Sequence, residues 1–188
     1  MLPWSRETTG MRNRSEWLRR NGLVDSDWPD LSDEHLLATL PAWLGPHVWG
    51  LVRLEQLRRI DMNSALRSLL DERRRRQIEQ MAPTHVLTPA GSRIALEYGE
   101  GIQPVMAVRL QEMFGQKESP VVAGGRVRVL LHLLSPAGRP LAVTSDLSSF
   151  WANAYSDVRK QMRGRYPKHS WPEDPGSAVP HSSRRSRK

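Results

Sequence analysis

The chain has 188 residues, enough for one domain or two small ones, and 28 Lys and Arg against 20 Asp and Glu give a net charge of +8, which favours a polyanionic partner. Cysteine is absent, which excludes disulfides, thiolate metal sites and thiol nucleophiles and fits a reducing compartment. No apolar run approaches bilayer length and charges interrupt the first 20 residues, so we expect no membrane span, no signal peptide and a cytoplasmic protein.

Helical patterns dominate the first half of the sequence. Ser32 is a good N-cap for a helix that continues through leucines at helical spacing, until Pro41 kinks or restarts it. Residues 46–60 continue the helical pattern. A longer helix is predicted over 63–81, and Pro83 ends it. We therefore predict a small helical bundle over residues 1–82.

The hydrophobic period changes near residue 84. Alternation predicts one β-hairpin from HVLT and RIALEY, and a second from RVRVLLHLL and LAVT. Two helices are predicted as well: one from a cap at Ser145 or Asp146 to about Gly164, and one over 104–115 whose single apolar face holds Met106, Leu110, Met113 and Phe114. The fold class is α+β, with a helical bundle followed by a module of two hairpins and two packed helices over 83–171.

The last residues have a different composition. The stretch after Trp171 reads PEDPGSAVPHSSRRSRK, with three prolines, four serines and Val179 as the single bulky aliphatic side chain. Such a stretch buries too little apolar surface to offset the entropy lost on ordering. We therefore predict a disordered basic tail over 172–188.

Motifs for catalysis and metal binding are missing from the sequence. It contains no G-x-x-x-x-G-K-[ST] phosphate loop, no H-E-x-x-H zinc motif, no histidine pair at ligand spacing and no G-x-S-x-G nucleophile turn. We expect no catalytic residue, no metal ligand and no cofactor in this chain.

Arg73 to Arg76 form the most conspicuous run of charge. Successive residues turn by about 100° around a helix, so four consecutive arginines point in different directions instead of lining one face. Acidic residues three or four positions away suit local ion pairs. A solvated helix is the favoured interpretation, with a nucleic-acid contact as the alternative.

Residues 158–171, VRKQMRGRYPKHSW, combine cations with flat rings. Cations that follow phosphates and rings that stack on bases are typical of single-strand binding sites. The candidate nucleic-acid-binding residues are Arg159, Lys160, Arg163, Arg165, Tyr166, Lys168, His169 and Trp171. The alternative is that Tyr166 and Trp171 pack on the last helix and the cations are only solvated. Trp151 and Tyr155 lie on the apolar stripe of that helix and are predicted to be core residues.

Several strings in the sequence carry a resemblance to a known family. They are WPDLSD, LLATLPAWL, APTHVLTPAGSRIALEY, VMAVRLQEMFG, GGRVRVLLHLLSPAGRPLAVTSDLSSFW and VRKQMRGRYPKHSWPEDP. Together they resemble the C-terminal region of the HrpB-type bacterial ATP-dependent helicases of the DEAH-box class. The resemblance runs from about Trp28 to Pro175, is loose over 10–24 and does not include 1–9.

The resemblance implies the position of this chain within a larger helicase; it does not imply a catalytic site. In that family two RecA-like motor domains precede this region and hold the Walker lysine, the Asp-Glu-Ala-His box and the arginine fingers, none of which is present here. It implies a non-catalytic auxiliary domain of an RNA helicase: a helical segment over 1–82, an HrpB-type C-terminal domain over 83–171 and the tail.

The resemblance also suggests partners. ATP and magnesium would belong to the motor domains, and the partners would be RNA or another single-stranded nucleic acid and the motor domains, in cis or in trans. A competing hypothesis is a protein-docking module, in which the loop GRYPKHSW grips the helicase core or a partner protein.

Overall fold

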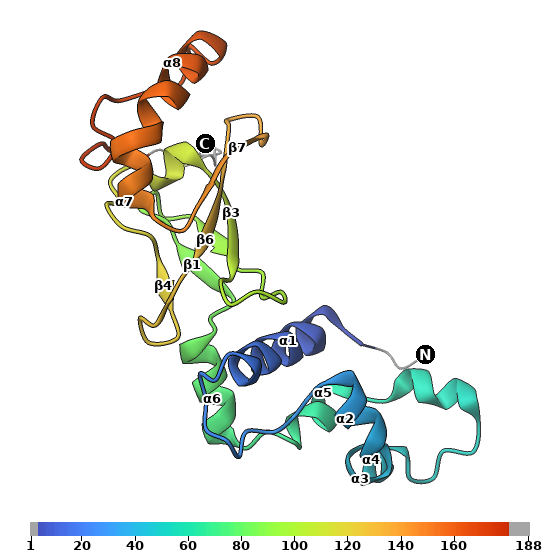
Figure 1. Cartoon of the computed structure of the whole chain (residues 1–188). Helices are drawn as coiled ribbons and strands as arrows, with labels where there is room; N and C mark the ends of the chain where they lie inside the picture. Colours follow the sequence, from blue (N-terminus) through green and yellow to red (C-terminus); the bar gives the residue numbers. More distant parts are fainter. Residues whose placement is uncertain (1–3, 181–188) are drawn as a thin grey trace. The chain divides into compact units, whose positions relative to one another are not determined.

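A computed structural model describes residues 4–180, apart from the side chains of Leu54 and Arg59. Its contacts divide the chain into two compact units, the first ending at Ala82 and the second beginning at Pro83. Each unit is described by itself below, with the labels of Figure 1.

The first unit consists of short helices joined by capped turns. The helices are α1 (Arg6–Arg20), α2 (Asp33–Ala38), α3 (Leu40–Trp43), α4 (Gly45–Val48), the 3-10 helix η1 (Leu54–Arg59), α5 (Met62–Arg67) and α6 (Glu72–Met81). Ser32 caps α2 by accepting a hydrogen bond from the His35 amide, and α3 restarts with Pro41 in its first turn. Both features agree with the prediction from the sequence.

The two longer helices predicted in this unit are each broken. The stretch 46–60 is divided between α4 and η1, and the stretch 63–81 between α5 and α6. The second break has a local cause, because the Asp71 carboxylate accepts a hydrogen bond from the Arg74 amide and so starts a new helix. An aspartate that bonds nearby backbone amides favours a cap over a helix interior.

Helix α1 was not singled out by the sequence analysis, yet it anchors the first unit. Its apolar side chains Trp17 and Leu18 are fully buried. Its polar side chains hold the loop before α2: Glu16 Oε1 accepts a hydrogen bond from the Leu31 amide at 2.6 Å, and Arg12 Nε donates to the Leu31 carbonyl at 2.6 Å. One helix therefore supplies both core and loop support.

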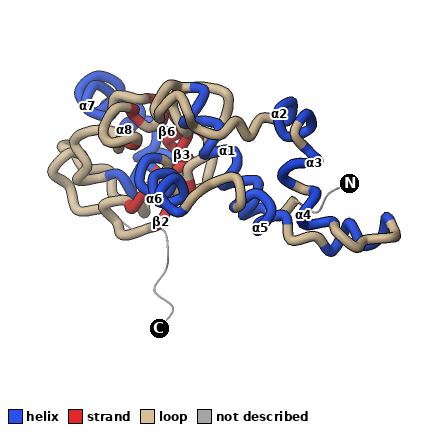
Figure 2. Tube along the Cα trace, turned by 90° about the horizontal axis from the view of Figure 1, so that it is seen from below, coloured by secondary structure: helices blue, strands red, loops and turns tan. Residues whose placement is uncertain are grey.

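The second unit mixes short strands and helices, and Figure 2 shows its strands among long loops. The strands are β1 (His85–Leu87), β2 (Arg93–Ala95), β3 (Val105–Arg109), β4 (Val121–Val122), β5 (Val127–Arg128), β6 (Leu130–Leu134) and β7 (Pro140–Thr144). The helical elements are the 3-10 helix η2 (Leu110–Met113), α7 (Leu147–Ser149), the π-helical turn η3 (Phe150–Ala154) and α8 (Tyr155–Arg165). These elements confirm the α+β class.

Three sheets form in this unit. β1 pairs with β2 and β6 with β7, both antiparallel, which confirms the two predicted hairpins. A third hairpin joins β4 and β5, through a turn in which Ala123, Gly124 and Gly125 all have positive φ. The paired glycines thus serve a tight turn, for which a residue without Cβ is well suited.

The helix predicted over 104–115 is wrong. Val105–Arg109 is a strand, β3, which pairs in parallel with β6, and the chain then turns through η2. Met106, Leu110 and Phe114 are fully buried, as the predicted helix face required. Burial on β3 follows the alternation of a strand, because Met106 and Val108 lie two positions apart and share the buried face. Pairing with β6 outweighs the local helical pattern.

The disordered tail predicted from residue 172 is also wrong over its first part. Residues 172–180 return along the second unit, where Pro175 is buried and its carbonyl accepts a hydrogen bond from the Gly115 amide at 2.9 Å. The packing partners are supplied by the rest of the unit, so low apolar content did not prevent ordering. Residues 181–188, which include Arg184, Arg185, Arg187 and Lys188, lie outside the described residues.

Among residues 4–180, none of the helices has the length and apolar character that crossing a membrane requires.

The alternation of the central strand predicts an unequal effect of two neighbouring substitutions. Leu131 is fully buried and Leu130 half-buried, on opposite faces of β6. We expect Leu131→Ala to lower the free energy of unfolding by about 2–5 kcal/mol through the cavity that it leaves, and Leu130→Ala to lower it clearly less. Urea denaturation of the full chain, followed by circular dichroism, measures both. Equal losses would contradict this register.

Candidate nucleic-acid interface

Helix α8 and the turn before it are fixed to the second unit by an aromatic cluster. Trp151 Nε1 donates to the Gln116 carbonyl at 2.7 Å. The rings of Trp151 and Tyr155 meet edge to face with centroids 5.3 Å apart, and both lie 6.2 Å from Phe114. Tyr155 is buried and Trp151 half-buried, which confirms them as packing residues rather than ligand contacts.

The chain leaves α8 at Tyr166 and returns beside the helix. Three hydrogen bonds hold this return segment, which we define as residues 166–173. Tyr155 Oη donates to the Pro172 carbonyl at 2.9 Å, Arg159 Nε donates to the Trp171 carbonyl at 2.9 Å, and Trp171 Nε1 donates to the Tyr166 carbonyl at 3.0 Å. Arg159 also forms an ion pair with Glu173 at 2.8 Å.

The five predicted cations fall into two groups. Arg159 is held by the return segment, and Lys160 lies 3.4 Å from Asp157 in an exposed pair. Arg163, Arg165 and Lys168 are exposed, and within residues 4–180 no acidic side chain forms an ion pair with them. These three cations are therefore available to a ligand, whereas Arg159 is committed to the fold.

The three predicted rings also differ. Trp171 is only 7% exposed, and its indole N–H donates a hydrogen bond to the Tyr166 carbonyl. A base therefore has no access to the indole face, and the expectation that Trp171 stacks on a base is wrong. Tyr166 is half-buried and meets exposed His169 edge to face, with ring centroids 6.1 Å apart and an interplanar angle of 84°. Tyr166 and His169 remain the rings beside the free cations.

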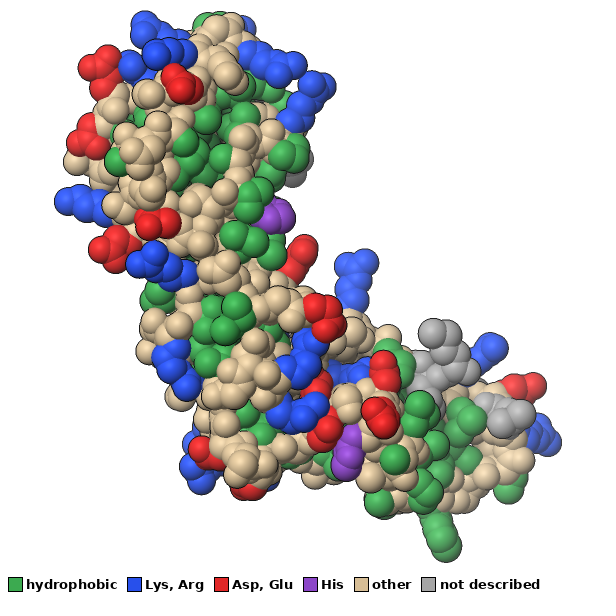
Figure 3. Space-filling view, in the orientation of Figure 1, with side chains coloured by type: hydrophobic (Ala, Val, Ile, Leu, Met, Phe, Trp, Pro, Cys, Tyr) green, Lys and Arg blue, Asp and Glu red, His purple; other side chains and the backbone are tan. Residues whose placement is uncertain are grey.

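The electrostatic character of this end of the second unit is positive. Figure 3 shows Lys and Arg side chains gathered over the end that carries α8. Residues 155–173, which form α8 and the return segment, hold five Lys and Arg against two Asp and Glu, a net charge of +3. A cluster of one sign attracts a polyanion and increases its rate of encounter.

The arginine run on α6 differs from this site. Arg74 pairs with Asp27 at 2.7 Å, and Arg75 and Arg76 pair with Glu72 at 2.6 and 3.0 Å. The hydrogen bond from Arg75 is the main reason why the pKa of Glu72 lies below its ordinary value. These local pairs support the interpretation of a solvated helix.

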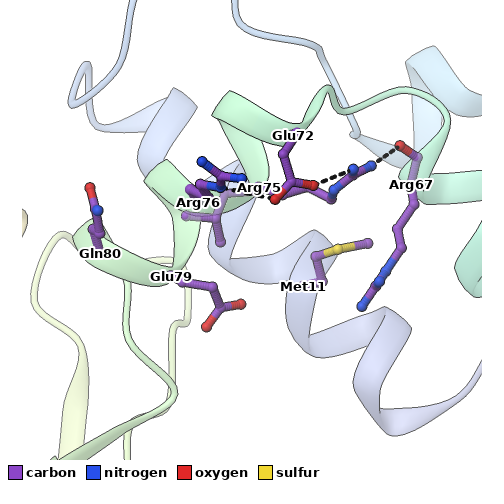
Figure 4. Close-up of a pocket in the computed structure, with 8 residues that line it drawn as sticks. Met11, Arg67, Glu72, Arg75, Arg76, Glu79 and Gln80 are labelled. Carbon is purple, nitrogen blue, oxygen red and sulfur yellow. Dashed lines mark hydrogen bonds and ion pairs between the residues drawn. The ribbon is translucent and has the colours of Figure 1, made fainter.

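The same arginines line an open cavity in the first unit. Figure 4 shows this cavity of about 350 Å³, with Met11 of α1 and Arg67 of α5 facing α6. The side chains of Arg75 and Arg76 lie toward Glu72, in the ion pairs drawn there. The other two charged side chains of the lining, Arg67 and Glu79, form ion pairs with Glu7 and Arg14, so each charge around the cavity has a partner within the first unit.

Metal binding finds no support in the described part of the chain. Among those residues, no group of three or more His, Asp or Glu side chains is placed to hold an ion. The site consists of cations and rings, which suits binding to an anion.

The comparison with family profiles decides the assignment. The profile described as "ATP-dependent helicase C-terminal" (HrpB_C) matches residues 43–175, more than half of the chain. This chain belongs to that family. The match includes all of α8 and the return segment, together with the three sheets of the second unit.

Relatives of known identity agree with the profile. The chain is 46% identical over 192 residues to the ATP-dependent RNA helicase HrpB of Escherichia coli K12, a match that covers all of this chain and 23% of the relative. The crystal structure of the E. coli DExH-box NTPase HrpB superposes with a TM-score of 0.84 over 98% of this chain and 22% of that one, at 46% identity. A structure of E. coli DEAH/RHA helicase HrpB gives 0.71 over 90% of this chain and 21% of that one, at 44% identity.

The chain thus spans less than a quarter of the length of these helicases, and it matches their C-terminal region. The match to the relative extends over the first nine residues, where the sequence analysis found no resemblance. In the structure Ser5 caps α1 by accepting a hydrogen bond from the Thr8 amide.

Sequence reasoning missed the residues that hold the return segment. Pro172 and Glu173 were assigned to the predicted tail, although both bond to α8. A signal was present, since Trp171 followed by Pro172 places a large apolar side chain directly before the stretch assumed to be free. A tryptophan at that point indicates that the chain is still packed.

The buried Tyr155 hydroxyl, which donates a hydrogen bond to the Pro172 carbonyl, predicts that stability depends on pH. Burial raises the pKa of Tyr155 to about 12 from its ordinary value near 10, and the Arg159 charge opposes that rise only in part. The neutral hydroxyl therefore stabilises the fold fully below pH 10, and this contribution is lost as the pH rises toward 12.

We expect Tyr155→Phe to lower the free energy of unfolding by about 1 kcal/mol at pH 7, because the hydrogen bond to Pro172 is lost. Phenylalanine does not titrate, so the advantage of the wild type over the variant is expected to shrink between pH 10 and 12. Chemical denaturation at a series of pH values measures this difference. A difference that stays constant across that range would show that the hydroxyl does not titrate as described.

Proposed function

We propose that this chain is a non-catalytic auxiliary region of an HrpB-type helicase that contacts the backbone of single-stranded RNA. The observation that carries the proposal is the group of Arg163, Arg165 and Lys168, exposed and without an ion pair in the described chain, at the end of α8 and on the return segment. Such cations bind phosphates, and they select no base sequence.

The rigidity of this end supports binding. Arg163 and Arg165 lie on α8, and the return segment that carries Lys168 is bonded to this helix through Tyr155 and Arg159, so little order has to be gained when a ligand binds. Tyr166 and His169 lie beside the cations and offer flat surfaces for a base. Arg159 and Trp171 act in this proposal as positioning residues, and Lys160 as a peripheral charge.

The proposal assigns energy conversion to the rest of the helicase. ATP and magnesium would bind the motor domains, in cis or in trans, and this chain would hold RNA beside them in the cytoplasm. No residue of this chain is given a catalytic role.

The salt dependence of RNA binding tests the contact. Three phosphate contacts to a single strand predict a slope of log K against log salt of about −2, so that binding weakens about 20-fold between 50 and 200 mM salt. The measurement is fluorescence anisotropy of a labelled oligouridylate titrated with the full chain. We expect the triple substitution of Arg163, Arg165 and Lys168 by Ala to abolish this slope together with most of the affinity.

A matched control removes the same charge elsewhere. Lys117, Arg93 and Arg139 are also exposed cations of the second unit, and their substitution by Ala changes the net charge equally. We expect this control to retain most of the affinity. Equal losses of RNA affinity in the two triple variants would show that net charge, and not the position of the cations, determines binding. Unchanged RNA binding in the first variant would contradict the proposal and favour the use of the loop 164–171 for protein docking.

The positioning role of Arg159 gives a separate prediction. Arg159→Gln removes the ion pair with Glu173 and loosens the return segment, but it removes no proposed phosphate contact. We expect weaker RNA binding with a salt slope that stays near −2, whereas Arg163→Ala is expected to reduce the slope by about 0.7. The same anisotropy titrations at several salt concentrations measure both. A reduced slope in Arg159→Gln would make Arg159 a direct contact.

A further inference from the structure

The loop that follows α4 exposes large apolar side chains. Trp49 is 90% exposed and Val52 86%, with Leu51 between them at 36%. We define these three residues as the Trp49 loop. Leu37 on α2 is also 70% exposed, and Figure 3 shows hydrophobic side chains gathered over α2, α3, α4 and the chain that follows. Exposed apolar side chains gathered in this way mark interaction surfaces.

The Trp49 loop is held by hydrogen bonds rather than free. Gly50 has φ +80°, which turns the chain sharply after Trp49, and the Leu51 amide donates to the Val48 carbonyl at 3.1 Å. Gln56 Oε1 then accepts from the amides of Val52 and Arg53, at 2.9 and 3.0 Å. The structure therefore presents an indole and a valine to solvent on a fixed backbone, which is typical of a preorganised contact.

The charge around this loop favours a protein over a nucleic acid. Residues 33–60 carry three arginines and three acidic residues, a net charge of zero, and residues 1–80 carry a net charge of +1. A polyanion gains little from such a surface. A large aromatic side chain flanked by balanced charge is instead characteristic of the centre of a protein interface.

We infer that the Trp49 loop docks on the part of an HrpB-type helicase that lies outside this chain. More than three quarters of the length of the relatives lies outside the matched region, so an HrpB-type helicase has a large further part on which this loop could dock. The profile match begins at residue 43 and includes the whole loop, which places these side chains within the family fold. This contact is separate from the proposed RNA site, which lies in the other unit.

The test compares the free chain with a full-length helicase. The host is E. coli HrpB in which the matching stretch is replaced by this chain, an exchange favoured by the TM-score of 0.84 at 46% identity. Hydroxyl-radical footprinting with mass spectrometry reads the oxidation rate of Trp49, with the buried Trp17 and Trp43 as internal references. We expect oxidation of Trp49 about tenfold slower in the chimera than in the free chain, because docking removes the indole from water.

Two double variants complete the design. Trp49→Ser with Val52→Ser is expected to leave the melting temperature of the free chain unchanged, since both side chains are exposed, and to increase amide hydrogen exchange of residues 46–53 about tenfold in the chimera. Val121→Ser with Val143→Ser removes two exposed apolar side chains, of smaller exposed area, from the second unit and is expected to leave that exchange unchanged.

The footprinting experiment also distinguishes other partners that could cover the Trp49 loop. Slower oxidation of Trp49 in the free chain as its concentration rises would identify a second copy as the partner. Slower oxidation only when oligouridylate is added would identify RNA. Either result, or equal oxidation in the free chain and the chimera, would overturn the inference, and none of them bears on the salt dependence of RNA binding.

Discussion

The candidate site depends on the attachment of the return segment to α8. Arg159 is the central group, because one guanidinium bonds the Trp171 carbonyl and the Glu173 carboxylate at once. Its side chain is 23% exposed but that of Glu173 is 86% exposed, so solvent screens the ion pair and the hydrogen bond to the Trp171 carbonyl carries more of the attachment. Burial of Trp171 adds an apolar anchor in the same segment. Without this attachment, Lys168 and the rings of Tyr166 and His169 would lie on a flexible segment and would lose entropy on binding a strand, whereas Arg163 and Arg165 are positioned by α8 itself.

Burial was more predictable from the sequence than secondary structure. Met106, Leu110 and Phe114 were assigned to one buried face, and all three are buried, but on a strand and a 3-10 turn instead of a helix. The reason is that hydrophobic spacing over a short stretch fits both periods, and the parallel partner β6 lies more than twenty residues away in the sequence. The caps at Ser32 and Asp146 were predictable because they depend only on neighbouring residues.

The candidate site was predictable as a region but not residue by residue. Composition indicated cations and rings between 158 and 171, and the structure separates them into residues that hold the fold and residues that are exposed. That separation depends on Glu173 and Pro172, which were interpreted as part of a free tail. Composition alone measures how much surface a segment could bury by itself; it does not measure the surface that the rest of the unit offers to it. For the same reason, composition alone did not distinguish a packed Trp171 from one that stacks on a base.

The two units carry surfaces of different chemistry, and this difference explains why the net charge of the chain is a poor guide to its partners. The first unit contains 13 of the 28 cations, but its arginines are largely paired with acids, as in the run on α6, and its exposed apolar loop is nearly neutral. The second half of the sequence carries most of the net positive charge, and its exposed cations include Arg163, Arg165 and Lys168, with which no described acidic side chain forms an ion pair. A polyanion is attracted by unpaired charge and a protein by exposed apolar surface, so the RNA contact that we propose for the second unit and the docking contact that we infer for the first depend on different surfaces.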